Sequence, residues 1–265
     1  MSTISVVIPC YNDALFLTVC LTALAAQTRP ADEIIVVDNL STDASAAIAR
    51  AAGVRVVTAA TSGIWPAAAT GFDAAGGDVI ARLDADSIPP ADWLARIDGA
   101  FAASPEVDVI TGPGDFYDCS PTVAGLGRVL YIGGYFWAIG LWLGGSPVFG
   151  SNFAIRRDTW REVRERVHRD RGDIHDDLDL SLHLGPSITV AYQHTLRVGI
   201  SARPFQSWAG FIRRLNWAYR TLALHWPAAA PWRLRAERRV WRAGIRRRAQ
   251  QGRREQSRPG QSRPW

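Results

Sequence analysis

The chain has 265 residues, of which 48% are hydrophobic and 21% charged, so it can form one large or two small globular domains with a substantial core. The net charge of +5 conceals an asymmetry. Residues 1–202 carry 14 arginines against 23 acidic residues, whereas residues 203–265 carry 16 arginines against two glutamates. The basic character therefore belongs to the C-terminal segment.

Cysteine and histidine residues give no sign of a metal site. The three cysteines are scattered, and the five histidines have no metal-ligand spacing, so we interpret the histidines as structural or surface residues. No secretory signal is recognisable at the start. We expect a reducing, cytoplasmic setting.

Apolar runs alternate with helical segments in the first third of the chain. One helix is predicted after Leu15 and another after an N-cap at Ser41. Short connections between strands and helices predict parallel βαβ units, with helices on both faces of the sheet. The runs predicted to be buried strands are Ile4–Ile8, Glu33–Val37, Val54–Val57 and Val79–Leu83.

Two carboxylates one residue apart, Asp84 and Asp86, follow the fourth of these runs. Ligands of open α/β sheets bind beyond the C-terminal strand ends, and carboxylate oxygens there suit Mg²⁺ or Mn²⁺. Tyr11 and Asp38 end two other strands at the same edge, which predicts a nucleotide-sized site. The alternative is that Asp84 and Asp86 only shape a turn and cap the next helix.

Residues 129–155 contain no charged side chain but many aromatic ones. About 20 apolar residues suffice to cross a bilayer. Glycines interrupt the run, however, and a crossing would separate Asp86 from Asp177, so we expect no transmembrane span. The segment is either a buried core helix or an apolar lip that receives a lipid-like or membrane-embedded acceptor.

Two acids, Asp176 and Asp177, stand at the start of a predicted helix beyond a charged helix from Asp158 to about Arg171. Either acid could simply cap its helix, or one of them is a catalytic carboxylate. Further strands are predicted at Val107–Thr111, near Ile155, at Ser187–Ala191 and at Leu196–Ile200.

The C-terminal segment interleaves tryptophan with arginine. Residues 205–225 are amphipathic, and the helical pattern continues to about residue 249 with arginine on nearly every turn. This composition suits the surface of an anionic membrane. A solvated helix packed on the domain and a nucleic-acid-binding helix are the alternatives, and we expect no nucleic acid. Residues 250–265 are expected to be disordered.

Five motifs, in this order, resemble the signature of family 2 glycosyltransferases. The resemblance covers about residues 2–203 and implies a GT-A fold, an α/β architecture with a Rossmann-like, mostly parallel sheet. It implies a nucleotide-sugar-binding half (1–112) and an acceptor-binding half (113–203). The residue pattern beyond them predicts a basic amphipathic helical extension (204–249). The motifs are Ser5–Asn12, Val36–Asp43, Leu83–Asp86, Gly150–Asn152 and Asp176–Leu180.

The resemblance also implies roles for residues that match the motifs. Asp177 would be the general base and Asp86 would coordinate the metal. The donor contacts would be Pro9, Tyr11, Asn12, Asp38, Asp84 and Asp86. The acceptor and sugar side would be formed by Gly150, Asn152 and Asp176.

We therefore expect a metal-dependent inverting glycosyltransferase, peripheral on the inner face of the cell membrane. It would move a sugar from a nucleotide-diphosphate sugar to a lipid-linked or glycan hydroxyl. A bound cation would neutralise the departing diphosphate, and the base would take the acceptor's proton. Ala67-Ala68-Ala69 replaces a common Ala-Arg-Asn sequence of the family, so a donor-contacting arginine is absent.

Two other classes of function are weighed against this expectation. A nucleotidyltransferase could share the sheet and the acids, but such enzymes usually begin with a glycine-rich basic loop, and residues 9–12 contain neither glycine nor arginine. A non-catalytic scaffold could bind anionic lipid or nucleic acid through the arginine-rich tail.

Overall fold

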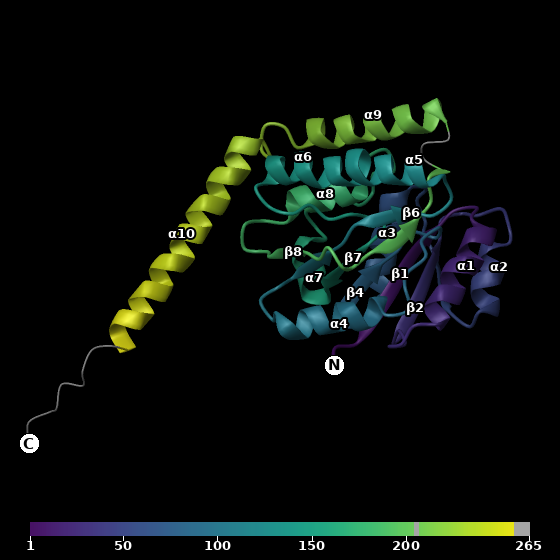
Figure 1. Ribbon diagram of the computed structural model, residues 1–265, viewed down its shortest axis with the longest axis horizontal. Helices are drawn as coiled ribbons and strands as arrows, with labels where there is room; N and C mark the ends of the chain where they lie inside the picture. Colours follow the sequence, from purple (N-terminus) through teal and green to yellow (C-terminus); the bar gives the residue numbers. More distant parts are fainter. Residues whose placement is uncertain (204–206, 257–265) are drawn as a thin grey trace, which may run out of the picture.

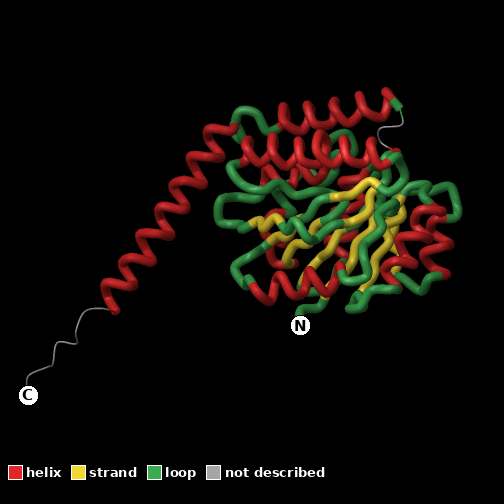
Figure 2. The backbone as a smooth tube through the Cα atoms, in the orientation of Figure 1, coloured by secondary structure: helices red, strands yellow, loops and turns green. Residues whose placement is uncertain are grey.

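A seven-stranded mixed sheet forms the centre of the computed structural model, which describes residues 1–203 and 207–256. The strand order is β3-β2-β1-β4-β7-β5-β8. Figure 2 shows the strands in yellow, enclosed by red helices. The strands are β1 (Ile4–Cys10), β2 (Glu33–Asp38), β3 (Arg55–Thr58), β4 (Val79–Arg82), β5 (Val109–Thr111), β7 (Phe153–Arg156) and β8 (Val190–Tyr192).

The first four strands are parallel, as the alternation of strands and helices predicts. β7 runs antiparallel to both β4 and β5, and β8 is parallel to β5. One sheet therefore crosses the predicted boundary between residues 112 and 113. A second, two-stranded sheet pairs β6 (Gly114–Phe116) with β9 (Val198–Ile200), and β6 was not predicted from the sequence.

Alternate residues of the central strands enter two separate cores. In β1, Val6 and Ile8 face one layer of helices, whereas Val7 faces the other, because successive side chains of a strand point to opposite faces. Trp65 and Trp160 pack in the second core with ring centroids 5.9 Å apart. The helices of the two layers are α1 (Ala14–Ala25), α2 (Ser45–Ala51), α3 (Ile64–Ala74), α4 (Trp93–Ala103), α7 (Arg157–Val163) and α8 (Asp176–His183).

Two predicted helix boundaries are wrong. α2 begins at Ser45, because Ser41 lies in the preceding loop, where its hydroxyl accepts a hydrogen bond from the Asn12 amide at 3.1 Å. The charged helix predicted from Asp158 to about Arg171 ends at Val163. Beyond it the chain forms turns that lead to α8.

A continuous helix includes residues 129–143 of the uncharged segment in spite of the glycines. It comprises α5 (Pro121–Leu126), the π-helical η1 (Gly127–Gly133) and α6 (Gly134–Leu143), and it ends where Gly144 adopts a left-handed conformation (φ 70°). The helix Pro121–Leu143 is long and apolar enough to cross a membrane, and only 11% of its most apolar 18-residue stretch is buried. The expectation that glycines interrupt the helix is wrong, and the segment is not a buried core helix.

Two long helices follow the domain. α9 (Trp208–Leu224) lies with α5 and α6 along the upper edge of the molecule in Figure 1, and α10 (Pro231–Gln256) extends outward from there. A small core joins them to the domain, because Leu143 of α6, Leu178 and Leu182 of α8 and Ala229 pack together. A disordered tail was predicted at residues 250–265; residues 250–256 continue α10, and residues 257–265 lie outside the described residues.

Candidate active site

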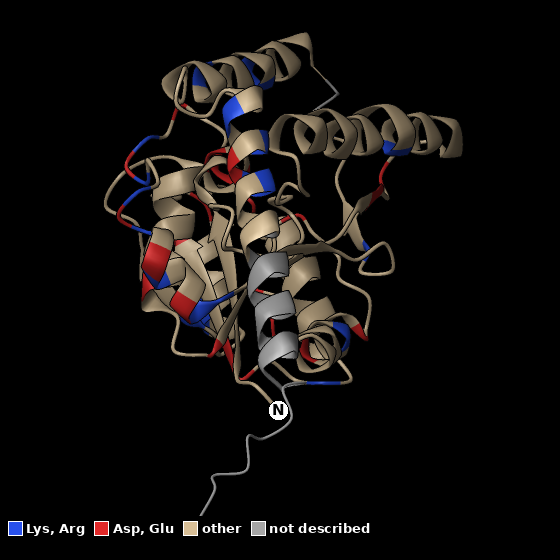
Figure 3. Cartoon of the chain, turned by 90° about the vertical axis from the view of Figure 1, so that its left-hand side faces the viewer, with Lys and Arg blue, Asp and Glu red and all other residues tan. Residues whose placement is uncertain are grey.

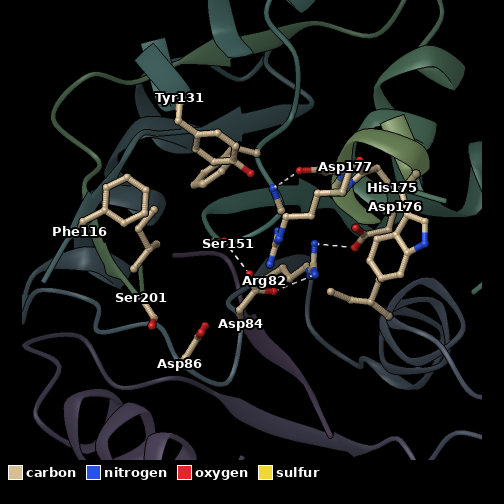
Figure 4. Close-up of a pocket in the computed structure, with 16 residues that line it drawn as sticks. Arg82, Asp84, Asp86, Phe116, Tyr131, Ser151, His175, Asp176, Asp177 and Ser201 are labelled. Atoms are coloured by element: carbon tan, nitrogen blue, oxygen red, sulfur yellow. Dashed lines mark hydrogen bonds and ion pairs between the residues drawn. The ribbon is translucent and has the colours of Figure 1, made fainter. Parts of the chain in front are cut away.

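Asp84, Asp86 and Asp177 line one cavity, although Asp177 is far from the other two in the sequence (Figure 4). Asp84 and Asp86 lie just beyond the C-terminal end of β4, and Asp177 lies in the first turn of α8. Asp176 and Gly150 also line the cavity, as do Ser151 and Arg214. The topology therefore gathers acids from distant motifs around one space.

A buried arginine connects the two acidic motifs. Arg82, the last residue of β4, is 1% exposed. Its guanidinium donates to Oδ1 of Asp84 at 2.9 Å and lies 2.7 Å from Oδ2 of Asp176. An arginine buried in this way needs charged partners, because an unpaired buried charge is very costly. Arg82 thus fixes the position of Asp84 relative to Asp176 at the start of α8.

The two acids at the start of α8 have different environments. Burial raises the pKa of Asp176 to about 6, although the neighbouring Arg82 opposes this shift. Both acids line the cavity, but Asp177 is better placed for chemistry because its side chain is 15% exposed, against 6% for Asp176. Its Oδ2 accepts a hydrogen bond from the Gly150 amide at 3.0 Å, and its Oδ1 accepts one from the Leu178 amide at 2.8 Å. These two bonds fix the orientation of the carboxylate.

Position 150 requires a glycine, because a side chain there would collide with the residues of the site. A Cβ atom at this position would lie 2.5 Å from the Arg82 guanidinium and 3.2 Å from Oδ2 of Asp177. Next to it, the Ser151 hydroxyl donates to Oδ2 of Asp84 at 2.5 Å. The turn that carries both residues therefore connects Asp84 to Asp177.

Asn152, which was predicted to lie on the sugar and acceptor side, does not line the cavity. The residue is fully buried, and its Oδ1 accepts from the Trp93 indole at 3.0 Å. Its amide donates to the carbonyls of Pro113 and Leu196. A polar side chain in the core must form its hydrogen bonds within the protein. Asn152 does so with one side chain and two backbone carbonyls, which come from three different segments of the chain.

Asp86 is paired with an arginine from the end of the domain. Nη2 of Arg203 donates to Oδ2 of Asp86 at 2.7 Å, while Nη1 donates to Oδ1 of Asp13 at 2.6 Å. The guanidinium also lies over the ring of Phe16, 3.9 Å from its centroid. Burial and the nearby Asp84 raise the pKa of Asp86, whereas Arg203 lowers it.

The residues predicted to bind the nucleoside lie at neighbouring strand ends. Pro9 belongs to β1 and is buried, whereas Tyr11 is 57% exposed. Asn12 has a left-handed backbone (φ 51°), and its Oδ1 accepts from the Thr42 amide at 2.8 Å. Asp38 ends β2, which pairs with β1. These residues do not line the cavity that contains Asp177, and they lie along the same edge of the sheet as Asp84.

A second, mainly apolar cavity adjoins the first. The two cavities share Tyr131, Phe149, His175, Asp177 and Arg214. One wall comes from η1 and α6, and the opposite wall comes from α9. Three aromatic or apolar residues stand on the first wall and three on the second, namely Tyr131, Tyr135 and Ile139, and Phe211, Leu215 and Ala218.

Sequence reasoning missed three arginines that line the site or contact its acids. Arg82 gave a signal, because it is a charged residue within an otherwise apolar strand. Arg203 and Arg214 gave none, because they belong to a segment in which arginine is frequent. Only the fold brings Arg203 to Asp86 and Arg214 to the cavity wall.

Comparison with known proteins identifies related sequences. Residues 5–163 match the family described as glycosyl transferase family 2. The glycosyltransferase AglE of Haloferax volcanii is 36% identical over 101 residues, which cover 35% of this chain and 33% of that protein. An uncharacterized glycosyltransferase of Nostoc sp. is 35% identical over 113 residues, or 40% of this chain and 35% of that protein. The matches thus span about a third of the length of these curated relatives.

Solved structures are similar over a larger part of the chain. The mannosyltransferase PcManGT from Pyrobaculum calidifontis, in complex with GDP-Man and Mn²⁺, has a TM-score of 0.66 and 20% identity, covering 89% of this chain and 69% of that one. Glucosyl-3-phosphoglycerate synthase from Mycobacterium tuberculosis, with Mn²⁺ and UDP, has a TM-score of 0.52 and 20% identity, covering 77% and 74%. These likenesses confirm the predicted GT-A fold.

Proposed function

Because this chain belongs to glycosyl transferase family 2 and is a glycosyltransferase, we propose that it transfers a sugar with inversion from a nucleotide-diphosphate sugar to a lipid-linked hydroxyl. The observation that carries the proposal is the shared position of Asp177. This carboxylate borders both the acidic cavity that contains Asp84 and Asp86 and the apolar cavity beside it. A donor and an apolar acceptor can therefore meet at one carboxylate.

The donor occupies the acidic cavity and the adjoining sheet edge. Its nucleoside lies along Pro9, Tyr11, Asn12 and Asp38, at the ends of two paired strands. Ligands of open α/β sheets bind at this edge. GDP-Man or UDP occupies two proteins of the same fold, which supports a nucleotide-sugar donor here.

The acids at the end of β4 suit a divalent cation. Their donor atoms are carboxylate oxygens, the ligands that Mg²⁺ and Mn²⁺ prefer. Asp86 is the best candidate ligand, since both oxygens of Asp84 already accept from Arg82 and Ser151. A cation bound there would neutralise the diphosphate as it leaves. Mn²⁺ in the two similar structures supports the proposal.

Asp177 is the proposed base. It takes the proton of the acceptor hydroxyl while that oxygen attacks the anomeric carbon, and the bond from this carbon to the diphosphate oxygen breaks. The proton ends on Asp177 and the electron pair ends on the diphosphate. One displacement inverts the anomeric configuration. Gly150 and Leu178 hold the carboxylate through their amides, while Arg82 holds the neighbouring Asp176.

The acceptor enters through the apolar cavity between α6 and α9. Aromatic and aliphatic side chains of η1, α6 and α9 match a hydrocarbon chain better than a hydrophilic glycan. Arg214 adds one positive charge where this cavity meets the acidic one. Therefore we favour the lipid-linked acceptor over the glycan.

Exposed apolar side chains on the helices that line this cavity support a position at a membrane surface. Leu130 and Trp137 are both 70% exposed on the helix of residues 121–143, and Trp208 of α9 is 80% exposed. Water-exposed apolar surface of this extent marks an interaction site. Figure 3 shows arginine bands on the C-terminal helices, and these charges suit anionic lipid headgroups. We therefore propose that the protein attaches peripherally to the inner face of the membrane.

A thermal-shift screen of UDP-, GDP- and dTDP-sugars tests the donor. With Mn²⁺ present, we expect one nucleotide class to raise the melting temperature of the wild type. We expect a smaller rise for Asp86→Ala, because the cation contact is lost. The donor proposal is wrong if none of these sugars raises it.

A further inference from the structure

Three histidines that are widely separated in the sequence converge on one buried carboxylate. His168 follows α7, His183 ends α8, and His225 follows α9. They surround Asp179 of α8, whose side chain is fully buried. One potential ligand atom from each of the four residues lies within 4.8 Å of the others. This cluster is separate from the residues that line the two cavities described above.

Hydrogen bonds around the cluster orient its members. Oδ2 of Asp179 accepts from the Trp65 indole and from the His168 amide, each at 2.9 Å. Its Oδ1 therefore faces the imidazoles, 2.7 Å from Nδ1 of His168 and 3.3 Å from Nε2 of His225. Nδ1 of His225 lies 2.7 Å from the Thr221 carbonyl, which can only accept, so this nitrogen carries the proton.

This arrangement leaves two electron pairs facing each other. With its proton on Nδ1, a neutral His225 has a bare Nε2, and that atom faces Oδ1 of Asp179. Nδ1 of His183 lies 2.9 Å from the Asp179 carbonyl and 3.4 Å from Nε2 of His225, so its proton points mainly to the closer carbonyl. A proton on Nε2 of His225 removes the conflict, and so does a metal ion between the two atoms, which two further imidazoles can also reach. Metal-bound histidines typically donate their other ring nitrogen to such a carbonyl.

From this geometry we propose that His168, Asp179, His183 and His225 bind a zinc ion that holds the end of α9 against α8. A tetrahedral zinc ion with bonds of about 2.0–2.1 Å separates its ligand atoms by about 3.3–3.4 Å. Nε2 of His225 lies 3.3 Å from Oδ1 of Asp179 and 3.4 Å from Nδ1 of His183. His168 lies closer to Asp179 and moves outward by a fraction of an ångström.

The ligand atoms of the cluster indicate which metal it binds. Three imidazoles and one carboxylate suit zinc, whereas the all-oxygen acids at the end of β4 suit Mg²⁺ or Mn²⁺. His168 and His183 bind as neutral rings after their proton moves from Nδ1 to Nε2, with no net proton loss, and His183 gives up its hydrogen bond to the Asp179 carbonyl. The ion connects α8, which begins with Asp176 and Asp177, to α9, which forms a wall of the apolar cavity. Its role is structural.

Zinc titration of the EDTA-treated full chain tests the proposal by calorimetry and by melting temperature. We expect one zinc per chain in the wild type, with a rise in melting temperature. His168→Ala should bind zinc more than about 100-fold more weakly, and since this side chain is 35% exposed, the variant is expected to fold. His225→Ala should show the same loss.

Two variants serve as controls. His194→Ala removes an exposed histidine outside the cluster, and Asp86→Ala removes the other candidate cation site. Both should bind zinc as the wild type does. Wild-type affinity in His168→Ala and His225→Ala would overturn the proposal, as would a wild type that binds no zinc at micromolar concentrations. The titration is independent of sugar transfer, so its result stands apart from that of the proposed function.

Discussion

Nη2 of Arg203 lies 2.7 Å from Oδ2 of Asp86, the carboxylate that we propose as the cation ligand. The pair is only partly exposed, and Asp13 holds the other arm of the guanidinium. Arg203 thus supplies positive charge at the place where a divalent cation would supply it. The arginine and the cation are therefore expected to compete for one carboxylate.

Replacing Arg203 should strengthen cation binding in the absence of donor. We expect Arg203→Gln to bind Mn²⁺ about tenfold more tightly, equivalent to ~1.4 kcal/mol, because a competing charge-assisted hydrogen bond is removed. Calorimetric titration measures the affinity. Arg197→Gln is the matched control, since it removes an ion pair with Asp115. Unchanged or weaker Mn²⁺ binding by Arg203→Gln would argue against competition.

Removing the buried charge of Arg82 should cost far more stability than removing a surface charge. Arg82→Met leaves Asp84 and Asp176 without their partner, and we expect the free energy of unfolding to fall by ~3–5 kcal/mol. Arg55→Met breaks a half-exposed pair with Glu33 and should cost at most ~1 kcal/mol. Urea unfolding measures both. Equal losses in the two variants would contradict the bridging role of Arg82.

Asp176 should make the folded state less stable as the pH rises. Its pKa is raised by burial to about 6 from 3.8, so the folded state binds more protons than the unfolded state between these values. The contribution of Asp176 to the free energy of unfolding is complete below about pH 4 and is lost as the pH rises through about 6. The stability difference between wild type and Asp176→Asn should therefore fall by up to ~3 kcal/mol between pH 4 and pH 8.

Asp173→Asn is the control for this titration. The Arg171 guanidinium lowers the pKa of Asp173 to about 2, so its contribution changes only at lower pH. We expect a flat difference between pH 5 and pH 8 for this variant, from urea unfolding at each pH. If the stability difference between wild type and Asp176→Asn stayed flat or grew with pH, the raised pKa of Asp176 would be wrong.

Exposed side chains of the helix at residues 121–143 should contribute to vesicle binding. Leu130→Ser with Trp137→Ser removes two apolar groups, each worth ~1.5–3 kcal/mol when buried, so we expect at least a tenfold loss of affinity for anionic vesicles. Leu15→Ser with Val19→Ser is the control, because these exposed residues belong to α1. Cosedimentation measures binding. Equal binding by both double variants would exclude this helix as the contact.

Most of the parallel half of the fold is predictable because its signals are local. β1, β2 and β4 are short apolar runs, and the short connections between them leave little choice of topology. A helix was one of the two interpretations of residues 129–155, but its continuity through the glycines was not predicted, because glycine was interpreted as an interruption. Glycine disfavours a helix by only about 1 kcal/mol per residue, which a long apolar helix tolerates.

The site was predictable only in part. Asp84, Asp86 and Asp177 were identified, and the fold brings them to one cavity. Whether a polar side chain is buried depends on distant segments, so Asn152 was assigned to the ligand when its partners are Trp93 and two carbonyls. The three clustered histidines were likewise interpreted singly, because their separation in the sequence gives no metal-ligand spacing.

Asp177→Asn tests the central claim most directly, with the donor identified by the thermal-shift screen. The amide keeps the shape of the carboxylate but cannot accept the acceptor's proton, and a general base contributes roughly 10²–10⁴-fold to a rate. We predict that Asp177→Asn folds normally and binds the nucleotide sugar with wild-type affinity, while sugar transfer falls by about that factor and Asp173→Asn remains active. Transfer by Asp177→Asn at the wild-type rate would contradict the assignment of Asp177 as the base.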